Sequence, residues 1–122
     1  KAGMSDSRSA DHLDHIRQAA ADACGFVAGM DKPAFMADKR TQQAVVMSLV
    51  IIGEAATKLM DTDQAFVQAH PSIPWRAMRG MRNRMAHGYF DINLDVVWET
   101  VQVSLPELIE QLRGADSDPA SV

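Results

Sequence analysis

The longest helical pattern in the sequence is residues 38–60, DKRTQQAVVMSLVIIGEAATKLM. Its apolar side chains recur three and four positions apart, as at Ala44, Met47, Ile51 and Ala55, which is the period of one face of an α-helix. Further apolar residues widen this stripe, so we expect the helix to be buried on more than one side. No stretch of the sequence convincingly indicates a β-strand. The pattern therefore predicts the central helix of an all-α fold.

The remaining helices follow from capping residues and apolar stripes. The four principal helices are expected from Ser9 or Asp11 to near Gly29, from about Asp38 to Met60, from Trp75 to about His87, and from near Leu94 onward. Asp31 and the run 61–63 should cap short connecting helices. Pro106 should kink or divide the last helix, because proline removes a backbone donor. The predicted fold is an up-and-down helical bundle of four principal helices plus short connecting helices.

A chain of 122 residues fits one domain of ordinary size. Residues 9–113 are expected to form this single helical domain, and residues 114–122 a flexible tail. Residues 1–8 are expected to be a flexible N-terminus, since residues 1–3 ahead of Met4 resemble the remainder of a purification tag.

The composition favours a globular protein of the cytoplasm. Hydrophobic residues make up 47% and charged residues 23% of the chain, which is typical of a folded domain. The longest apolar run, residues 45–53, is interrupted by Ser48 and is shorter than the ~20 residues of a membrane span. One cysteine, Cys24, excludes an intramolecular disulfide and a cysteine-based zinc cluster. We therefore expect a cytoplasmic location and no membrane contact.

The charge is unevenly distributed along the chain. The net charge of −4 argues against a nucleic-acid partner, yet residues 64–90 contain no acid. The arginines of this basic segment are Arg76, Arg79, Arg82 and Arg84. Such a segment on an acidic protein is typical of a site for a phosphate-bearing ligand. Alternatively, these arginines pair with acids of other helices.

Residues 82–89, RNRMAHGY, combine an arginine, a carboxamide, a histidine and a phenol at one expected helix end. Asn83 and His87 are four positions apart and therefore share a face. Arg82 and His87 are five positions apart, about 140° around an ideal helix, so they do not face one another automatically. Their convergence requires a frayed helix end, long side chains or a second subunit.

These side chains suit the cleavage of RNA without a metal or cofactor. Histidine titrates near neutral pH, so His87 can take a proton from a ribose 2′-hydroxyl or give one to the leaving oxygen. The planar guanidinium of Arg82 can hold the phosphate and stabilise the charge of the transition state. Asn83 could fix the imidazole tautomer or bind phosphate. Arg79 and Arg84 could also bind phosphate. Two-fold symmetry would bring two such sets into one cleft, so a homodimer is expected.

Residues 82–90, RNRMAHGYF, resemble the RX4-6H motif of HEPN domains. The extended pattern Arg-Asn-x-x-x-His-x-Tyr resembles the HepT-like branch of these domains. Residues 52–56, 71–75, 97–99 and 105–108 agree with the same family, and the similarity extends from about Leu13 to Leu112.

The resemblance implies a HEPN-like, dimeric endoribonuclease that is the toxin of a type VII-like toxin–antitoxin pair. The usual partner of this family is a minimal nucleotidyltransferase, which acts as antitoxin. By position, Arg82 and His87 would be the catalytic pair and Asn83 their polar neighbour. Tyr89 matches the tyrosine that the partner modifies with AMP. Nucleotide phosphates beside Arg82 and His87 would occupy the place of substrate phosphate.

Other interpretations remain open. The chain could be a non-catalytic module that binds a nucleotide or RNA or docks a nucleotidyltransferase, or a purely structural helical dimer. Glu54 could pair with Arg79 or Arg82 and orient a catalytic arginine, or it could face solvent. Tyr89 could simply pack over the helix end. Phe90 and Trp75 fit packing better than base stacking.

His12 and His15, one turn apart, fit solvated helix surface better than a metal site, since no second helix offers matching ligands.

Overall fold

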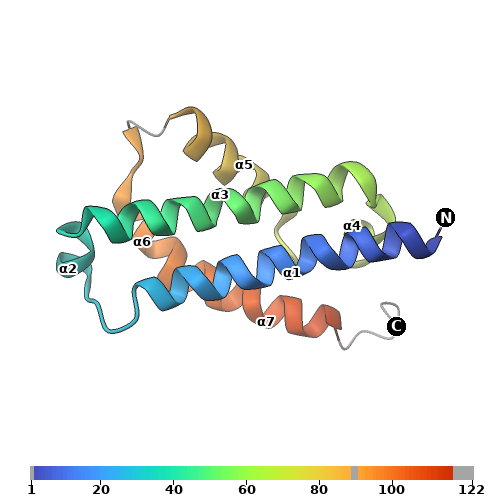
Figure 1. Ribbon diagram of the computed structural model, residues 1–122, viewed down its shortest axis with the longest axis horizontal. Helices are drawn as coiled ribbons and strands as arrows, with labels where there is room; N and C mark the ends of the chain where they lie inside the picture. Colours follow the sequence, from blue (N-terminus) through green and yellow to red (C-terminus); the bar gives the residue numbers. More distant parts are fainter. Residues whose placement is uncertain (1, 89–90, 117–122) are drawn as a thin grey trace.

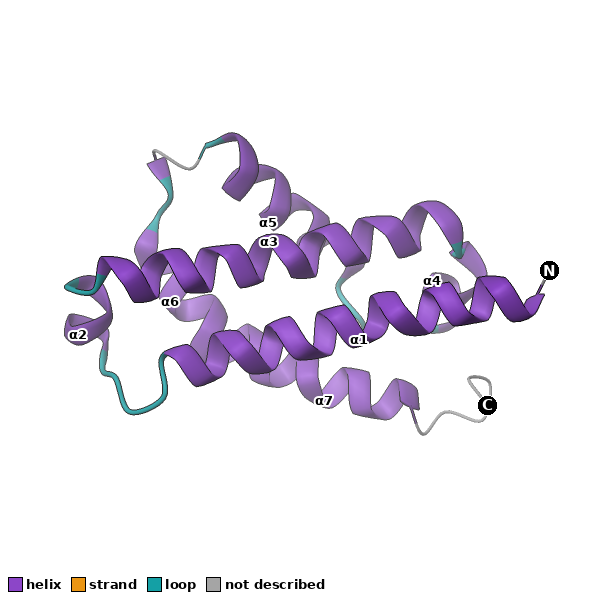
Figure 2. Ribbon diagram, in the orientation of Figure 1, coloured by secondary structure: helices purple, strands orange, loops and turns teal. Residues whose placement is uncertain are grey.

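The protein is an all-helical bundle (Figures 1 and 2). The structure, a computed structural model, describes residues 2–88 and 91–116, and no strand occurs in these two ranges. The principal helices are α1 (Ala2–Phe26), α3 (Lys39–Thr62) and α5 (Trp75–His87), followed by the pair α6 (Leu94–Glu99) and α7 (Leu105–Asp116). The short helices α2 (Lys32–Met36) and α4 (Gln64–Ala69) connect them. The predicted fold class is confirmed.

Helix α3 is the centre of the bundle. It packs against α1 on one side and against α5 on the other, and α7 also packs against α1 (Figure 1). The largest fully buried side chains of the described residues come from every layer: Phe35, Ile16, Leu49, Ile52, Leu59, Ile73, Leu112, Val45, Val97 and Val101. Burial of α3 on two sides is what its wide apolar stripe predicted.

By length and composition alone, α3 would be able to cross a membrane, contrary to the expectation from its longest apolar run. A core helix of a soluble protein meets the same criterion, because it is equally apolar. Val45, Leu49, Ile52 and Leu59 of α3 are fully buried inside the bundle. Their burial makes α3 compatible with a soluble protein.

Aspartates begin three of the helices, as predicted. Asp31, Asp38 and Asp63 cap α2, α3 and α4, and each carboxylate accepts a hydrogen bond from a backbone N–H of the first turn. The hydroxyl and the amide of Thr41 both donate to Asp38, and these bonds hold the pKa of its carboxyl below the ordinary value. Gly88 follows the last residue of α5, as expected.

The two ends of the chain are more helical than expected. Helix α1 begins at Ala2, so the expected cap Ser9 lies inside it, where its buried hydroxyl donates to Asp63 Oδ2 at 2.5 Å. Helix α7 continues to Asp116, because Ala115 is buried against the bundle and extends its apolar stripe. Residues 114–116 of the expected tail are therefore helical, and residues 117–122 lie outside the described residues.

The last helix is divided at Pro106, as predicted. A π-helical turn, Thr100–Ser104, separates α6 from α7, and Pro106 is the second residue of α7. Proline has no N–H to offer the preceding turn, and a wider turn there keeps Val101 and Leu105 buried on one face. The division thus preserves one continuous apolar stripe.

Helices α3 and α5 approach closely at Gly53. A Cβ atom placed there would lie 2.2 Å from Arg82 Cβ and 2.7 Å from the Met78 carbonyl oxygen. Both contacts belong to atoms close to or in the α5 backbone, which cannot move away without displacing the helix. Only glycine allows α5 to lie at this distance from α3.

Gly53→Ala is therefore expected to destabilise the protein strongly. Overpacking of this kind lowers the free energy of unfolding by about 3 kcal/mol, which corresponds to a melting temperature roughly 10 °C lower. Thermal unfolding followed by circular dichroism measures the effect. Gly25→Ala is the matched control, because Gly25 is also helical and a Cβ there meets nothing within 4 Å. Equal melting temperatures for the two variants would contradict the close packing.

Candidate active site

Helix α5 is held to the bundle by a stripe of methionines. Met78, Met81 and Met85 are buried at successive turns of the helix. Trp75 anchors the start of the helix: it is buried, and its Nε1 donates to the carbonyl oxygen of His70 at 3.0 Å. Trp75 is thus a packing residue, the interpretation the sequence favoured. The opposite side of α5 is left to polar and charged residues.

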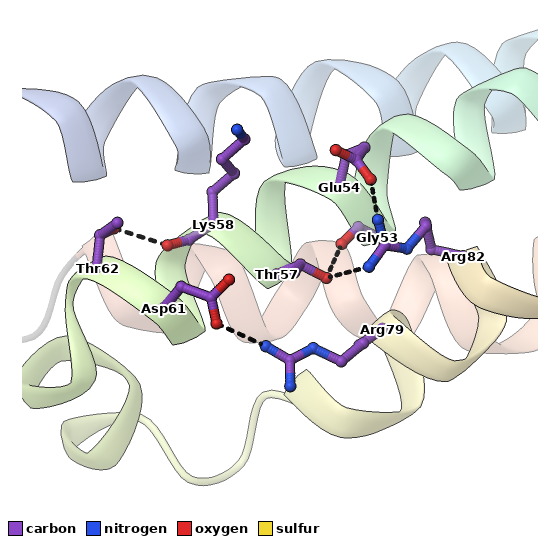
Figure 3. Close-up of polar contacts among 8 residues, drawn as sticks. All are labelled: Gly53, Glu54, Thr57, Lys58, Asp61, Thr62, Arg79 and Arg82. Atoms are coloured by element: carbon purple, nitrogen blue, oxygen red, sulfur yellow. Dashed lines mark hydrogen bonds and ion pairs between the residues drawn. The ribbon is translucent and has the colours of Figure 1, made fainter. Parts of the chain in front are cut away.

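Arg82 lies against α3 (Figure 3). Its Nη1 donates to Glu54 Oε1 in an ion pair, and its Nη2 donates to Thr57 Oγ1 at 3.4 Å. The Arg82 side chain is 22% exposed and that of Glu54 50% exposed. Of the two alternatives for Glu54, the structure has the pairing with Arg82, although the carboxylate also meets solvent.

Arg79 forms a second ion pair between α5 and α3 (Figure 3). Its Nη2 lies 3.0 Å from Asp61 Oδ1, two turns along α3 from Glu54. Glu54 therefore does not reach Arg79. The antiparallel course of α3 and α5 explains the order, because Glu54 precedes Asp61 while Arg82 follows Arg79.

The four arginines of the basic segment divide into two pairs. Arg79 and Arg82 are partly buried and neutralised by acids of α3. Arg76 and Arg84 are exposed, and neither side chain makes a hydrogen bond or ion pair within the described part of the chain. Both of the sequence alternatives thus occur, one for each pair, and the two exposed guanidiniums are available to an anion.

His87 is the last residue of α5 and is exposed. Its side chain contacts no hydrogen-bonding partner in residues 2–88 and 91–116, and neither does that of Asn83 one turn before it. Arg82 faces α3 and His87 faces solvent, so no hydrogen bond joins them within one chain. The structure does not bring the two motif residues together, as their separation around the helix suggested.

Tyr89 and Phe90 lie outside the described residues, so the structure does not address the expected modification site.

Similarity to known proteins identifies the family of this chain. The sequence model of the family described as "Ribonuclease HepT-like" matches residues 16–114. The chain belongs to this family.

Three relatives illustrate how far the similarity to HepT-like proteins extends. A protein of Thermococcus cleftensis named "Probable ribonuclease HepT" is 38% identical over 106 residues, which are 84% of this chain and 94% of the relative. "Putative RNase MJ0127" of Methanocaldococcus jannaschii is 34% identical over 80% of this chain and 84% of its own length. "Putative RNase TTE0752" of Caldanaerobacter subterraneus is 35% identical over 84% of this chain and 88% of its own length. No solved structure matches the chain significantly.

The family predicted from the motif is therefore confirmed, and with it the class of enzyme, a ribonuclease. The matched residues include the whole of α3 and α5. The site just described thus lies within the HepT-like part of the chain.

Two polar contacts of this HepT-like site were not predicted from the sequence. Thr57 and Asp61 hold Arg82 and Arg79, respectively, and neither stood out among the polar residues of α3. Their positions do carry a signal, because Glu54, Thr57 and Asp61 lie three, four and seven residues apart on one face of α3. That face is the one that meets the arginines of α5 (Figure 3).

His70 is buried, although it lies in the connection between α4 and α5. Its Nδ1 lies 3.0 Å from the carbonyl oxygen of Phe66, and the two rings are 4.3 Å apart. Burial raises the pKa of the Cys24 thiol, in line with the inert cysteine inferred from the sequence.

Proposed function

We propose that this chain is a metal-independent endoribonuclease that acts as the toxin of a type VII-like toxin–antitoxin pair. The observation that carries the proposal is the end of α5 in a HepT-like chain, where an exposed histidine follows an arginine fixed by an ion pair. His87 is open to a substrate, and Arg82 is already oriented. A fixed cation and an accessible acid–base group on the same helix supply the two kinds of group that phosphodiester cleavage needs.

The proposed reaction uses the ribose as nucleophile. His87 accepts the proton of the 2′-hydroxyl, and the 2′-oxygen forms a bond to phosphorus. The bond from phosphorus to the 5′-oxygen breaks, and a second imidazolium gives that oxygen a proton. Arg82 stabilises the added negative charge on the phosphate oxygens. The products are a 2′,3′-cyclic phosphate and a free 5′-hydroxyl.

We further propose that the site is completed by a second copy of the chain. One chain has a single motif histidine, and the reaction needs both a base and an acid. A homodimer would supply the second His87 and could place it near the Arg82 of the first chain.

Two apolar features support self-association. Met47 and Ile51 of α3 are 59% and 40% exposed. Beside them lies a groove of about 480 Å³ lined by Val46, Met47, Val50, Met85, Ile92 and Leu94. This groove runs along α3 to the motif end of α5, so a second copy seated there would lie next to His87.

Asn83, Arg84 and Arg79 are proposed to bind the phosphates of the RNA. Asn83 and Arg84 are exposed near His87, and their side chains make no hydrogen bond within the described part of the chain. Arg79 is partly engaged by Asp61, so its contribution should be smaller.

Arg84→Gln is expected to weaken RNA binding and its dependence on salt. Each phosphate contact to single-stranded RNA contributes about −0.7 to the slope of log K against log salt, so the slope should become shallower by about 0.7. Fluorescence anisotropy with a 2′-O-methyl oligonucleotide, which has no nucleophile, measures binding without cleavage. Arg113→Gln is the control, because Arg113 is exposed on α7 and pairs with Glu110. An equal slope in both variants would exclude a phosphate contact by Arg84.

The proposed partner is a minimal nucleotidyltransferase that acts as antitoxin and modifies Tyr89 with AMP. Tyr89 follows His87 by two residues, so nucleotide phosphates added there would occupy the substrate's place and exclude it by charge and bulk. The catalytic unit is proposed to comprise residues 9–113 and to act in the cytoplasm, where its RNA substrate is present.

A ribonuclease assay in EDTA tests the proposal. The full chain is incubated with a labelled RNA, and with the same oligonucleotide carrying 2′-deoxyribose, and the product ends are analysed by mass spectrometry. Cleavage of RNA alone, with 2′,3′-cyclic phosphate ends, is the expected result. Light scattering should give the mass of a dimer.

Two outcomes contradict the proposal. Cleavage that requires added magnesium would exclude the metal-independent mechanism. No cleavage by a protein whose Tyr89 is unmodified would favour a non-catalytic module that binds RNA or docks a nucleotidyltransferase.

A further inference from the structure

Thr57 joins the backbone of α3 to the guanidinium of Arg82 (Figure 3). Its Oγ1 lies 2.8 Å from the carbonyl oxygen of Gly53 and 3.4 Å from Arg82 Nη2. The side chain is half-buried between α3 and α5. One chain of hydrogen bonds therefore links two neighbouring turns of α3 to an arginine 25 residues further along the sequence.

The direction of these hydrogen bonds is unambiguous. A carbonyl oxygen only accepts, so the single proton of the Thr57 hydroxyl goes to Gly53. A guanidinium only donates, so Thr57 Oγ1 accepts the hydrogen bond from Arg82 Nη2 through a remaining lone pair. Thr57 is thus held as an acceptor, pointed at Arg82 by its own helix.

Arg82 depends on its terminal nitrogens for its orientation. Its Nε is buried and makes no hydrogen bond within residues 2–88 and 91–116. Nη1 is held by Glu54, whose carboxylate is half exposed, and a single ion pair at the surface leaves a long side chain free to swing. The Thr57 contact adds a second point, and two contacts restrict the rotation of a guanidinium more than one contact does.

The stem of Arg82 is constrained at the same place. Gly53 packs so closely on Arg82 that a Cβ would lie 2.2 Å from Arg82 Cβ and 3.0 Å from its Cγ. The carbonyl that orients Thr57 thus belongs to the residue against which Arg82 packs. The base of the side chain and both of its terminal nitrogens contact one segment of α3, residues 53–57.

We propose that Thr57 is a positioning residue for Arg82 in the cleavage reaction. It fixes the rotation of the guanidinium, so that the N–H bonds of Nη1 and Nη2 that are not donated to α3 keep one orientation toward the substrate phosphate. This role rests on the proposed function of Arg82. Its effect falls on the chemical step, because a misdirected guanidinium stabilises the transition state less well while the RNA is still bound by other contacts.

Steady-state cleavage by three variants of the full chain tests the role. Thr57→Val keeps the shape but removes the acceptor, and it is expected to lower kcat about tenfold with little change in KM. Thr57→Ser keeps the hydroxyl and should retain kcat within about twofold. The matched control is Thr62→Val: Thr62 lies on the same helix, and its hydroxyl makes the same bond to the residue four positions back, Lys58, at 2.6 Å, without touching an arginine (Figure 3).

A double-mutant cycle separates positioning from an indirect effect on stability. If Thr57 acts through the guanidinium, Thr57→Val should have less than about a twofold effect on kcat when Arg82 is already lysine. An undiminished tenfold loss in the Arg82→Lys protein would overturn the proposal. So would a Thr57→Val protein as active as Thr62→Val.

A spectroscopic signature makes the test independent of turnover. The ¹⁵N order parameter of Arg82 Nε–H reports how rigidly the guanidinium is held. It should fall in Thr57→Val and stay unchanged in Thr62→Val, and equal values in both would overturn the proposal. The proposed function fails separately, if Arg82→Lys itself cleaves RNA at the full rate.

Discussion

His87→Ala is expected to abolish RNA cleavage while leaving the helical bundle intact. A general acid or base contributes about 10²–10⁴ to the rate, and in a homodimer one substitution removes both the base and the acid. We therefore expect a loss of about 10⁴-fold or more, measured by product formation in EDTA. The fold should persist, because His87 is exposed and makes no hydrogen bond with the described residues.

Two controls make this result specific. The melting temperature of His87→Ala should stay within about 2 °C of the parent protein, since exposed substitutions change stability by roughly 0.5 kcal/mol or less. His15→Ala should cleave at the parent rate, because His15 is an exposed histidine of α1, on the far side of α3 from α5. Activity retained in His87→Ala would point to another site or to a contaminating nuclease.

Arg82→Lys should lower cleavage about 10²-fold with only a small loss of stability. Lysine can still pair with Glu54, so the contact between α3 and α5 is kept. Its single nitrogen cannot contact the carboxylate and also present a planar fork to the phosphate. Single-turnover cleavage at saturating protein measures this loss in the chemical step, separately from RNA binding.

Arg17→Lys is the matched control for Arg82→Lys. Arg17 is also partly buried and ion-paired, with Asp14 Oδ1 at 3.0 Å, but it lies on α1 outside the candidate site. This variant should cleave at the parent rate and melt near the parent temperature. If Arg82→Lys were as active as Arg17→Lys, Arg82 would be a purely structural residue of the helix pair.

Local signals in the sequence predicted the helices well. Asp31 and Asp63 were expected as caps and cap α2 and α4, Asp38 was expected to start α3 and caps it, and Gly88 follows α5. These signals are reliable because each acts within one helical turn, between a side chain and backbone groups that are neighbours in sequence. The apolar stripes of the helices follow the same local rule, since the period of a helix depends on the backbone alone.

The helix ends that were wrong depend on contacts distant in sequence. Ser9 was expected as a cap but lies within α1, where it bonds to Asp63 at the start of α4. Helix α7 passes the expected end at residue 113, because Ala115 is buried against the bundle. A contact with a residue distant in sequence stabilises a helix end in a way that the local sequence pattern does not show.

For the motif of residues 82–89, too, some properties follow from the sequence and others only from the tertiary structure. Its residue types, together with the other stretches that agree with the family, were sufficient to identify the HepT-like family. Its spacing predicted that Arg82 and His87 point in different directions around one helix. The partner of Arg82 was a choice between alternatives, because it depends on how α3 and α5 lie against one another. Gly53 allows the two helices to approach, and their antiparallel register then brings Glu54 and Thr57 to Arg82 and Asp61 to Arg79. Register and rotation between helices are set by the packing of side chains from both, so only the folded protein determines which arginines are bound and which remain open to a phosphate.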